Sequence, residues 1–96
     1  NLLINAIYYS PTNGVVHISA SQNDKQVILK ISDEGKGLSD EDLEKVFQPF
    51  YSTKPVGEGS GLGLSVVHGI VTSHKGTILA ENNSTKGSTF TVILPK

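Results

Sequence analysis

Four glycines alternate with other residues between Gly57 and Gly63, and an apolar helical pattern follows directly. Glycine has no Cβ, so its backbone can take positive φ and approach a ligand closely, at an entropic cost to folding. The apolar residues that recur at helical spacing are Leu62, Val66, Val67, Ile70 and Val71. Such a loop at a helix start offers unpaired N–H groups and the positive end of the helix dipole. The stretch therefore predicts a phosphate-binding site.

Neither familiar glycine motif for phosphate matches this stretch. The P-loop requires a lysine after its last glycine, and here Leu64 follows Gly63. The dinucleotide fingerprint requires a preceding strand, whereas residues 51–58 are polar and interrupted by a proline. A simple tight turn is the remaining alternative, but four alternating glycines cost more stability than a connection needs.

Composition limits the classes of protein. Ninety-six residues make one domain, residues 1–96, which is long enough to bury roughly two-thirds of its unfolded surface. A net charge of −1 without a basic run argues against nucleic acid or an anionic membrane as a partner. The absence of cysteine excludes a disulfide scaffold and a thiolate zinc site. No signal peptide or long apolar span is present, so any membrane attachment would lie outside this chain.

Periodicity predicts the order of helices and strands. Residues 1–9 show a helical pattern without a starting cap, so we expect the domain to be truncated at its N-terminus. Ser39 is predicted to cap a short second helix, and the glycine-led helix is predicted to end near Gly76. Strand patterns that pair as two hairpins are found at residues 15–20, 27–32, 77–81 and 88–94. The predicted fold is an α+β two-layer sandwich, with a mixed, mostly antiparallel sheet and helices on one face.

Two polar features accompany the glycine stretch. Asn1 and Asn5 share a face of the first helix, where their carbonyl oxygens are candidate ligands for Mg²⁺, with capping or solvent exposure as the alternative. Asp33 ends a strand and is followed by Gly35 and Gly37, which would let a flat ring lie against the main chain. This segment is either a simple turn or the floor of a pocket in which a carboxylate accepts a hydrogen bond from an amine.

Together, these segments resemble the ATP-binding catalytic domain of sensor histidine kinases, within the GHKL ATPase superfamily. The resemblance covers nearly the whole chain, and its four boxes stand in the family's order. They are Asn1-Leu2-Leu3-Ile4-Asn5-Ala6 (N box), Asp33-Glu34-Gly35-Lys36-Gly37 (first glycine box), Phe47-Gln48-Pro49-Phe50 (F box) and Gly59-Ser60-Gly61-Leu62-Gly63-Leu64 (second glycine box). The resemblance implies a GHKL-type ATP-binding fold, with an ATP lid at about residues 51–60.

The resemblance also implies roles for individual residues. Asn5, with Asn1 as a helper, would coordinate a Mg²⁺ that bridges the ATP phosphates. Asp33 would accept the adenine amino group, with Thr89 as its support from the neighbouring strand. Tyr9 would stack against the adenine ring.

The phosphates would be bound by the second glycine box, where Gly61, Leu62 and Gly63 would offer main-chain N–H groups. Lys54, in the lid, would meet the γ-phosphate and is the candidate catalytic residue. Many family members carry a lysine three residues after the second N-box asparagine, where this chain has Tyr8. That departure gives Lys54 more of the phosphate charge to neutralise.

The function implied is that of a cytoplasmic protein histidine kinase domain, which binds Mg-ATP and donates the γ-phosphate to a histidine on a separate dimerisation domain. A response regulator would act downstream. None of His17, His68 and His74 is followed by an acidic residue, as an acceptor histidine of the family would be, so the chain alone is expected to be inactive. The alternatives are a GHKL ATPase of the gyrase, chaperone or mismatch-repair type, an anti-sigma-type serine kinase, and a non-catalytic nucleotide-binding module.

Overall fold

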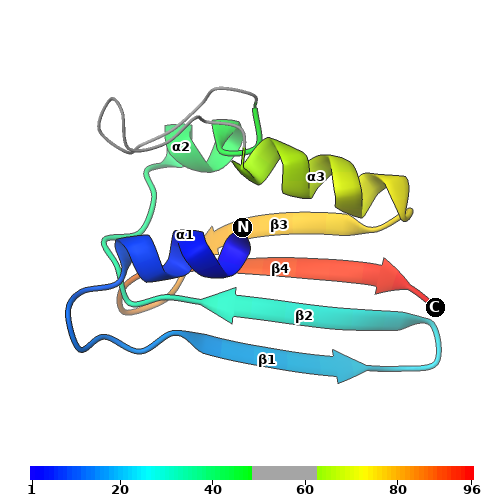
Figure 1. Cartoon of the computed structure of the whole chain (residues 1–96), viewed down its shortest axis with the longest axis horizontal. Helices are drawn as coiled ribbons and strands as arrows, with labels where there is room; N and C mark the ends of the chain where they lie inside the picture. The colour runs from blue at the N-terminus through cyan, green and yellow to red at the C-terminus, as the bar shows by residue number, and fades with distance from the viewer. Residues whose placement is uncertain (49–62) are drawn as a thin grey trace.

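The computed structural model describes residues 1–48 and 63–96 (Figure 1). The elements are α1 (Leu2–Tyr9), β1 (His17–Gln22), β2 (Gln26–Ser32), α2 (Asp40–Lys45), α3 (Gly63–Ser73), β3 (Thr77–Asn82) and β4 (Ser88–Pro95). Every predicted helix and strand is present, although β1 begins and ends two residues later than the predicted 15–20. The longest of these helices has 11 residues, and none in the described ranges is long and apolar enough to cross a membrane.

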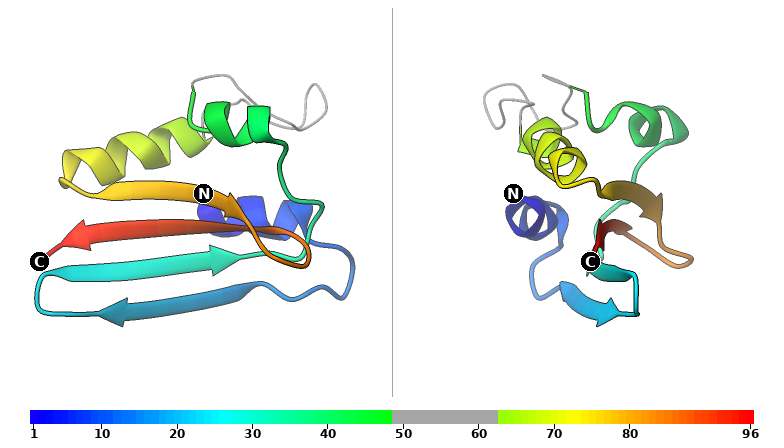
Figure 2. Two further views of the ribbon diagram at one scale, coloured as in Figure 1. Left: turned by 180° about the vertical axis from the view of Figure 1, so that it is seen from behind. Right: turned by 90° about the vertical axis from the view of Figure 1, so that its right-hand side faces the viewer.

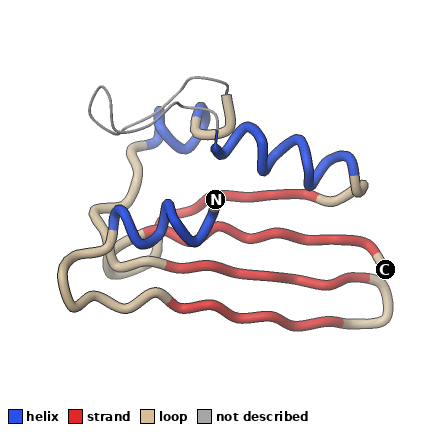
Figure 3. The backbone as a smooth tube through the Cα atoms, viewed as in Figure 1, coloured by secondary structure: helices blue, strands red, loops and turns tan. Residues whose placement is uncertain are grey.

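The four strands form one sheet in the order β1-β2-β4-β3 (Figure 3). Both predicted hairpins are present, and β2 joins them by pairing with β4. All three pairings are antiparallel, so no parallel pair occurs within residues 1–48 and 63–96. Figure 2 shows α1 and α3 together on one face of this sheet. The predicted two-layer α+β fold is confirmed.

Strand alternation explains where the core lies. Ile31 pairs with Phe90, and Phe90 pairs with Ala80, so these side chains form a row on the face that the helices cover. The buried centre of the core is Val71 of α3 against Ile78 and Val92 of the sheet. The partly buried side chains that pack around it are Leu2, Leu29, Phe47, Val67 and Leu94.

The aromatic ring of Phe47 connects the end of the α2 segment to this core. Its centroid lies 6.0 Å from that of Phe90, edge-on, and 5.7 Å from the ring of His68. The cap of α2 is as predicted, because the Ser39 hydroxyl accepts a hydrogen bond from the Asp42 N–H at 3.1 Å. Phe47, the first phenylalanine of the F box, is thus a packing residue that holds α2 beside α3.

Edge strand β1 is exposed along its whole length. Ile18 faces the same side as Ile31, as the alternation predicts, yet it is 57% exposed. The main contacts of α1 with the sheet are to β2, and the exposed residues of β1 show that the helix layer of the described residues leaves this strand uncovered. Alternation therefore predicts the direction of an apolar side chain but not whether another element covers it.

Candidate nucleotide-binding site

A buried carboxylate, that of Asp33, lies directly beyond the end of β2 and is 4% exposed. Its Oδ1 accepts hydrogen bonds from the Gly35 N–H at 2.9 Å and the Ser88 N–H at 3.3 Å. Its Oδ2 accepts one from the Ser88 hydroxyl at 3.0 Å. An ionised carboxylate offers about four lone-pair positions, so these three donors satisfy most but not all of them. Asp33 can therefore accept a further hydrogen bond from a bound donor.

Thr89 does not support Asp33, and that prediction is wrong. The Thr89 hydroxyl donates to the side-chain oxygen of Asn83, and it is hydrogen-bonded to the Ser32 hydroxyl at 3.0 Å. Side chains alternate along a strand, so a shift of one residue moves a group to the opposite face of the sheet. Ser88 is two residues before Phe90 and therefore lies on the same, inward face of β4. It is Ser88 that donates hydrogen bonds to the Asp33 carboxylate. The inward pattern of Phe90 and Val92 already carries this signal in the sequence.

Two glycines shape the loop between Asp33 and Leu38. A Cβ on Gly35 would lie 2.5 Å from the Tyr9 carbonyl oxygen, so the loop reaches the C-terminal end of α1 only because that atom is absent. Gly37 has φ of +77°, and a Cβ there would lie 2.9 Å from the side-chain oxygen of Asn82. Both positions therefore require glycine for packing of the protein itself, which is a different reason from the predicted contact with a flat ring.

Of the predicted metal ligands, Asn5 lies in α1 and Asn1 is the N-cap residue of this helix. Asn1 is exposed and Asn5 is half-buried, one helical turn apart, and the Asn5 N–H donates to the Asn1 carbonyl at 3.0 Å. This bond joins main-chain atoms and does not involve the side-chain amide of either residue. The described residues also contain no cluster of three or more acidic or histidine side chains suited to a metal. A cation here would depend on amide oxygens, water and ligand phosphates, which is the donor set that Mg²⁺ accepts.

The start of α3 faces the start of α1. A Cβ on Gly63 would lie 3.8 Å from both the Cγ and the Oδ1 of Asn1. Gly63 and Leu64 form the first turn of α3, and both are half-buried. The fold thus brings the N box to the end of the second glycine box. The rest of that box, residues 59–62, together with Lys54 and the predicted lid at 51–60, lies outside the described residues.

Tyr9 is half-buried at the C-terminal end of α1. Its ring meets that of Tyr8 edge-on, with centroids 4.9 Å apart. Its carbonyl oxygen is the atom that Gly35 approaches, so the residue does lie beside the Asp33 loop. Stacking of its ring on adenine stays a prediction.

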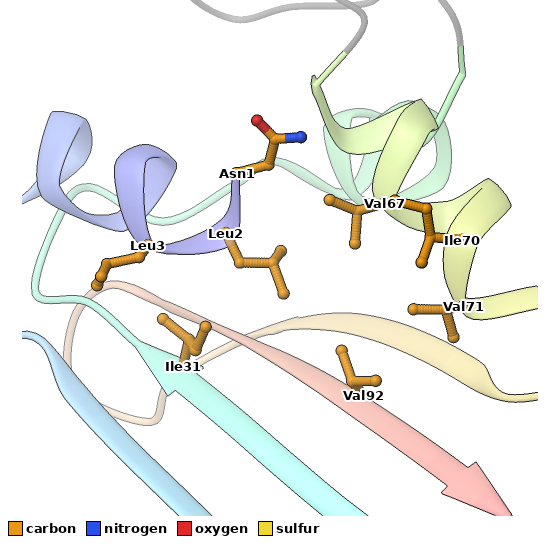
Figure 4. Close-up of a pocket in the computed structure, with 8 residues that line it drawn as sticks. All are labelled: Asn1, Leu2, Leu3, Ile31, Val67, Ile70, Val71 and Val92. Atoms are coloured by element: carbon orange, nitrogen blue, oxygen red, sulfur yellow. The ribbon is translucent and has the colours of Figure 1, made fainter. Parts of the chain in front are cut away.

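An apolar cavity of about 420 Å³ lies between α1 and α3 (Figure 4). Its lining comes from α1, the sheet and α3 and consists of Asn1, Leu2, Leu3, Ile31, Val67, Ile70, Val71 and Val92. Asn1 is its one polar lining residue, and Asp33 does not line it. A triphosphate needs N–H donors and cations, which this lining lacks. The cavity is therefore separate from the candidate nucleotide floor.

The class of this protein is a nucleotide-binding α+β domain of the GHKL type. Three features define it: helices cover one face of an antiparallel sheet, a buried acid follows an inner strand, and the helix with the two asparagines faces the helix that begins with glycine. The chain belongs to the family described as histidine kinase-, DNA gyrase B- and HSP90-like ATPases, whose model matches residues 1–96.

Several known proteins that the chain resembles are sensor histidine kinases. It is 44% identical over 95 residues to the sensor histidine kinase ZraS of Escherichia coli (strain K12), covering 99% of this chain and 20% of ZraS. The solved structure of the mycobacterial sensor histidine kinase MprB matches with a TM-score of 0.87 and 31% identity, over 98% of this chain and 64% of that one. The histidine kinase ThkA in complex with the response regulator protein TrrA matches with a TM-score of 0.83 and 32% identity, over 100% of this chain and 26% of that one. The chain thus spans a fifth of the length of ZraS.

Proposed function

We propose that this chain is the ATP-binding part of a protein histidine kinase, which binds ATP with Mg²⁺ and presents the γ-phosphate to a histidine on a separate dimerisation domain. The observation that carries the proposal is the buried Asp33 carboxylate, hydrogen-bonded on both oxygens and still able to accept. The family match over residues 1–96 and the likeness to ZraS support the same reading.

Asp33 would select adenine through the exocyclic amino group. A carboxylate accepts hydrogen bonds only, so it pairs with the amino group of adenine and meets the carbonyl oxygen of guanine as a second acceptor. An unmatched acceptor pair in a buried place is costly. Gly35 and Gly37 bring the main chain around this acid, and Tyr9 lies at the same loop. ATP should therefore bind more tightly than GTP.

The phosphate end would lie where α1 faces the start of α3. In nucleotide sites Mg²⁺ is held by few protein oxygens together with water and phosphate oxygens, and the amide oxygens of Asn5 and Asn1 could supply the protein share. When bound, Mg²⁺ would neutralise charge on the β- and γ-phosphates. Gly63 and Leu64 open α3, whose N-terminal N–H groups and dipole favour an anion. Positioning and electrostatics are the main requirements of phosphoryl transfer, and these residues would supply part of both.

The acceptor histidine is proposed to come from a partner domain. His17, His68 and His74 are exposed, and no ion pair joins a histidine to an acid in the described part of the chain. A response regulator would then receive the phosphate, as the complex of ThkA with TrrA suggests for this family. A cytoplasmic location belongs to the same proposal, since ATP and this partner are expected there.

The test has two steps. Isothermal titration calorimetry on the folded chain should detect ATP in the presence of Mg²⁺ and weaker binding of GTP. Phosphate transfer from radiolabelled ATP to an added dimerisation domain from a histidine kinase should then occur, and transfer to the same domain with its acceptor histidine replaced should not. Absence of ATP binding by folded protein would overturn the proposal. Binding without transfer to any such acceptor would favour the non-catalytic module instead.

A further inference from the structure

The β3–β4 connection holds the Asp33 loop through two side-chain amides. Asn82, the last residue of β3, accepts a hydrogen bond on Oδ1 from the Leu38 N–H at 2.8 Å. Its Nδ2 donates to the Leu38 carbonyl at 2.6 Å. The Asn82 side chain thus forms hydrogen bonds with both the N–H and the carbonyl of Leu38. Two residues that face each other in an antiparallel sheet form the same pair of bonds through their main chains. The amide acts as a one-residue extension of the sheet toward the loop.

The Asp33 end of the same loop is held independently. The Asp33 N–H donates to the Ser88 carbonyl at 2.9 Å, and Asn83 Nδ2 donates to the Asp33 carbonyl at 3.1 Å. Gly87 has φ of +82°, and a Cβ there would lie 1.9 Å from the Asp33 carbonyl oxygen. The hairpin therefore contacts both ends of the loop, but only Asn82 holds the Leu38 end among the described hydrogen bonds.

We propose that Asn82 is a positioning residue for nucleotide selection, which fixes the Leu38 end of the loop so that Asp33, Gly35 and Gly37 form one preformed wall for adenine. The inference rests on the proposed function, since it concerns the same site. Asn82 would not touch the nucleotide, because its amide is used by Leu38 on both atoms. Leu38 also precedes Ser39, the cap of α2, so the same clamp sets where α2 begins.

Loss of the two hydrogen bonds between Asn82 and Leu38 should weaken nucleotide binding because the loop spends less time in its binding form, not because a contact with the nucleotide is lost. The β3–β4 pairing runs through main-chain bonds from Thr77–Ile93 to Asn82–Ser88 and needs no Asn82 side chain. If the loop then adopts its binding form about a tenth of the time, the apparent affinity for ATP falls about tenfold. GTP gains no matched hydrogen bond at Asp33, so it should distinguish less between the binding form and the other loop forms and lose less affinity. The ratio of ATP affinity to GTP affinity should therefore fall.

The experiment compares two Asn82 variants with a matched control in the full chain. Asn82→Ala removes both bonds, and Asn82→Asp keeps the size and the acceptor but places an acceptor against the Leu38 carbonyl. The control is Asn23→Ala in the β1–β2 turn, which Figure 1 shows at the opposite end of the sheet from the β3–β4 connection. There, Asn23 Oδ1 accepts hydrogen bonds from the Lys25 and Gln26 N–H groups at 2.9 Å each. Each protein is titrated with ATP and with GTP in the presence of Mg²⁺, and its melting temperature is measured. Hydrogen exchange at the Leu38 amide is followed by NMR.

Both Asn82 variants should melt cooperatively, bind ATP about tenfold more weakly, show a lower ATP-to-GTP ratio and exchange the Leu38 amide faster. Asn23→Ala should change none of the last three. Unchanged ATP affinity and selectivity in a folded Asn82 variant, with normal binding by the unsubstituted chain, would overturn this inference alone. No ATP binding by the unsubstituted chain would overturn the proposed function and this inference with it. Slow Leu38 exchange in Asn82→Ala would show that the clamp does not hold the loop.

Discussion

Replacing Asp33 tests the proposed adenine floor most directly. In Asp33→Ala, the donors on Gly35 and Ser88 lose their acceptor, and so does the amino group of the nucleotide. Each buried donor left unsatisfied costs about 1–3 kcal/mol, so the folded state should lose about 2–4 kcal/mol of stability, because part of the space can take up water. The binding free energy of ATP should become less favourable by about 2 kcal/mol, which raises its Kd about 30-fold.

Asp33→Asn separates these two effects. The remaining carbonyl oxygen can still accept from the Gly35 and Ser88 N–H groups, and the new amide can donate to the Ser88 hydroxyl oxygen. The fold should therefore be kept, with a change in stability of about 1 kcal/mol or less. The amide nitrogen would face the adenine amino group donor to donor, so ATP binding should still weaken at least as much as in the alanine variant.

Calorimetry with Mg-ATP and Mg-GTP measures the binding, and thermal unfolding followed by circular dichroism measures the stability. The expected result is a stable Asp33→Asn protein with weak ATP binding and no preference for ATP over GTP. A folded Asp33→Asn protein that binds ATP as tightly as the unsubstituted chain would refute the reasoning, because the fold would be intact and the acceptor changed. Equal losses for ATP and GTP would also refute it, since the amino group is what distinguishes them.

Three further predictions follow from the same contacts. Ser88→Ala should lower stability by about 1.5 kcal/mol and weaken ATP binding more than Thr89→Val does, measured by melting and calorimetry; the reverse order would contradict the Ser88 assignment. Asn5→Ala should reduce the ratio of ATP affinity with Mg²⁺ to that without it, and a ratio unchanged from the parent would remove Asn5 from the metal site. Gly35→Ala should cost about 1–3 kcal/mol of stability and displace the loop, whereas Gly69→Ala in α3, where a Cβ meets nothing within 4 Å, should stabilise by about 0.5–1 kcal/mol; similar melting temperatures for the two would argue against the close contact at Tyr9.

Local patterns were sufficient to predict the elements of this fold. Alternating apolar residues such as Ile31, Phe90 and Val92 indicate strands with one inward face, and β2 and β4 have that face against the helices. The same alternation fixes parity, so it distinguishes Ser88 from Thr89 once Phe90 is known to be inward. The family resemblance implies Thr89 as the support of Asp33, whereas the strand pattern of this chain favours Ser88.

The clamp at Leu38 was beyond such patterns. Asn82 is 44 residues away from Leu38, and an asparagine at the end of an edge strand carries no local sign of which loop its amide will reach. Gly37 is read from the sequence as a turn or as room for a flat ring, but the atom nearest to its missing Cβ is the side-chain oxygen of Asn82. The glycine and the asparagine thus explain each other only when the folded chain brings them together. Long-range polar contacts of this kind decide how firmly a loop is held, so the affinity of a site depends on residues that its sequence motif does not contain.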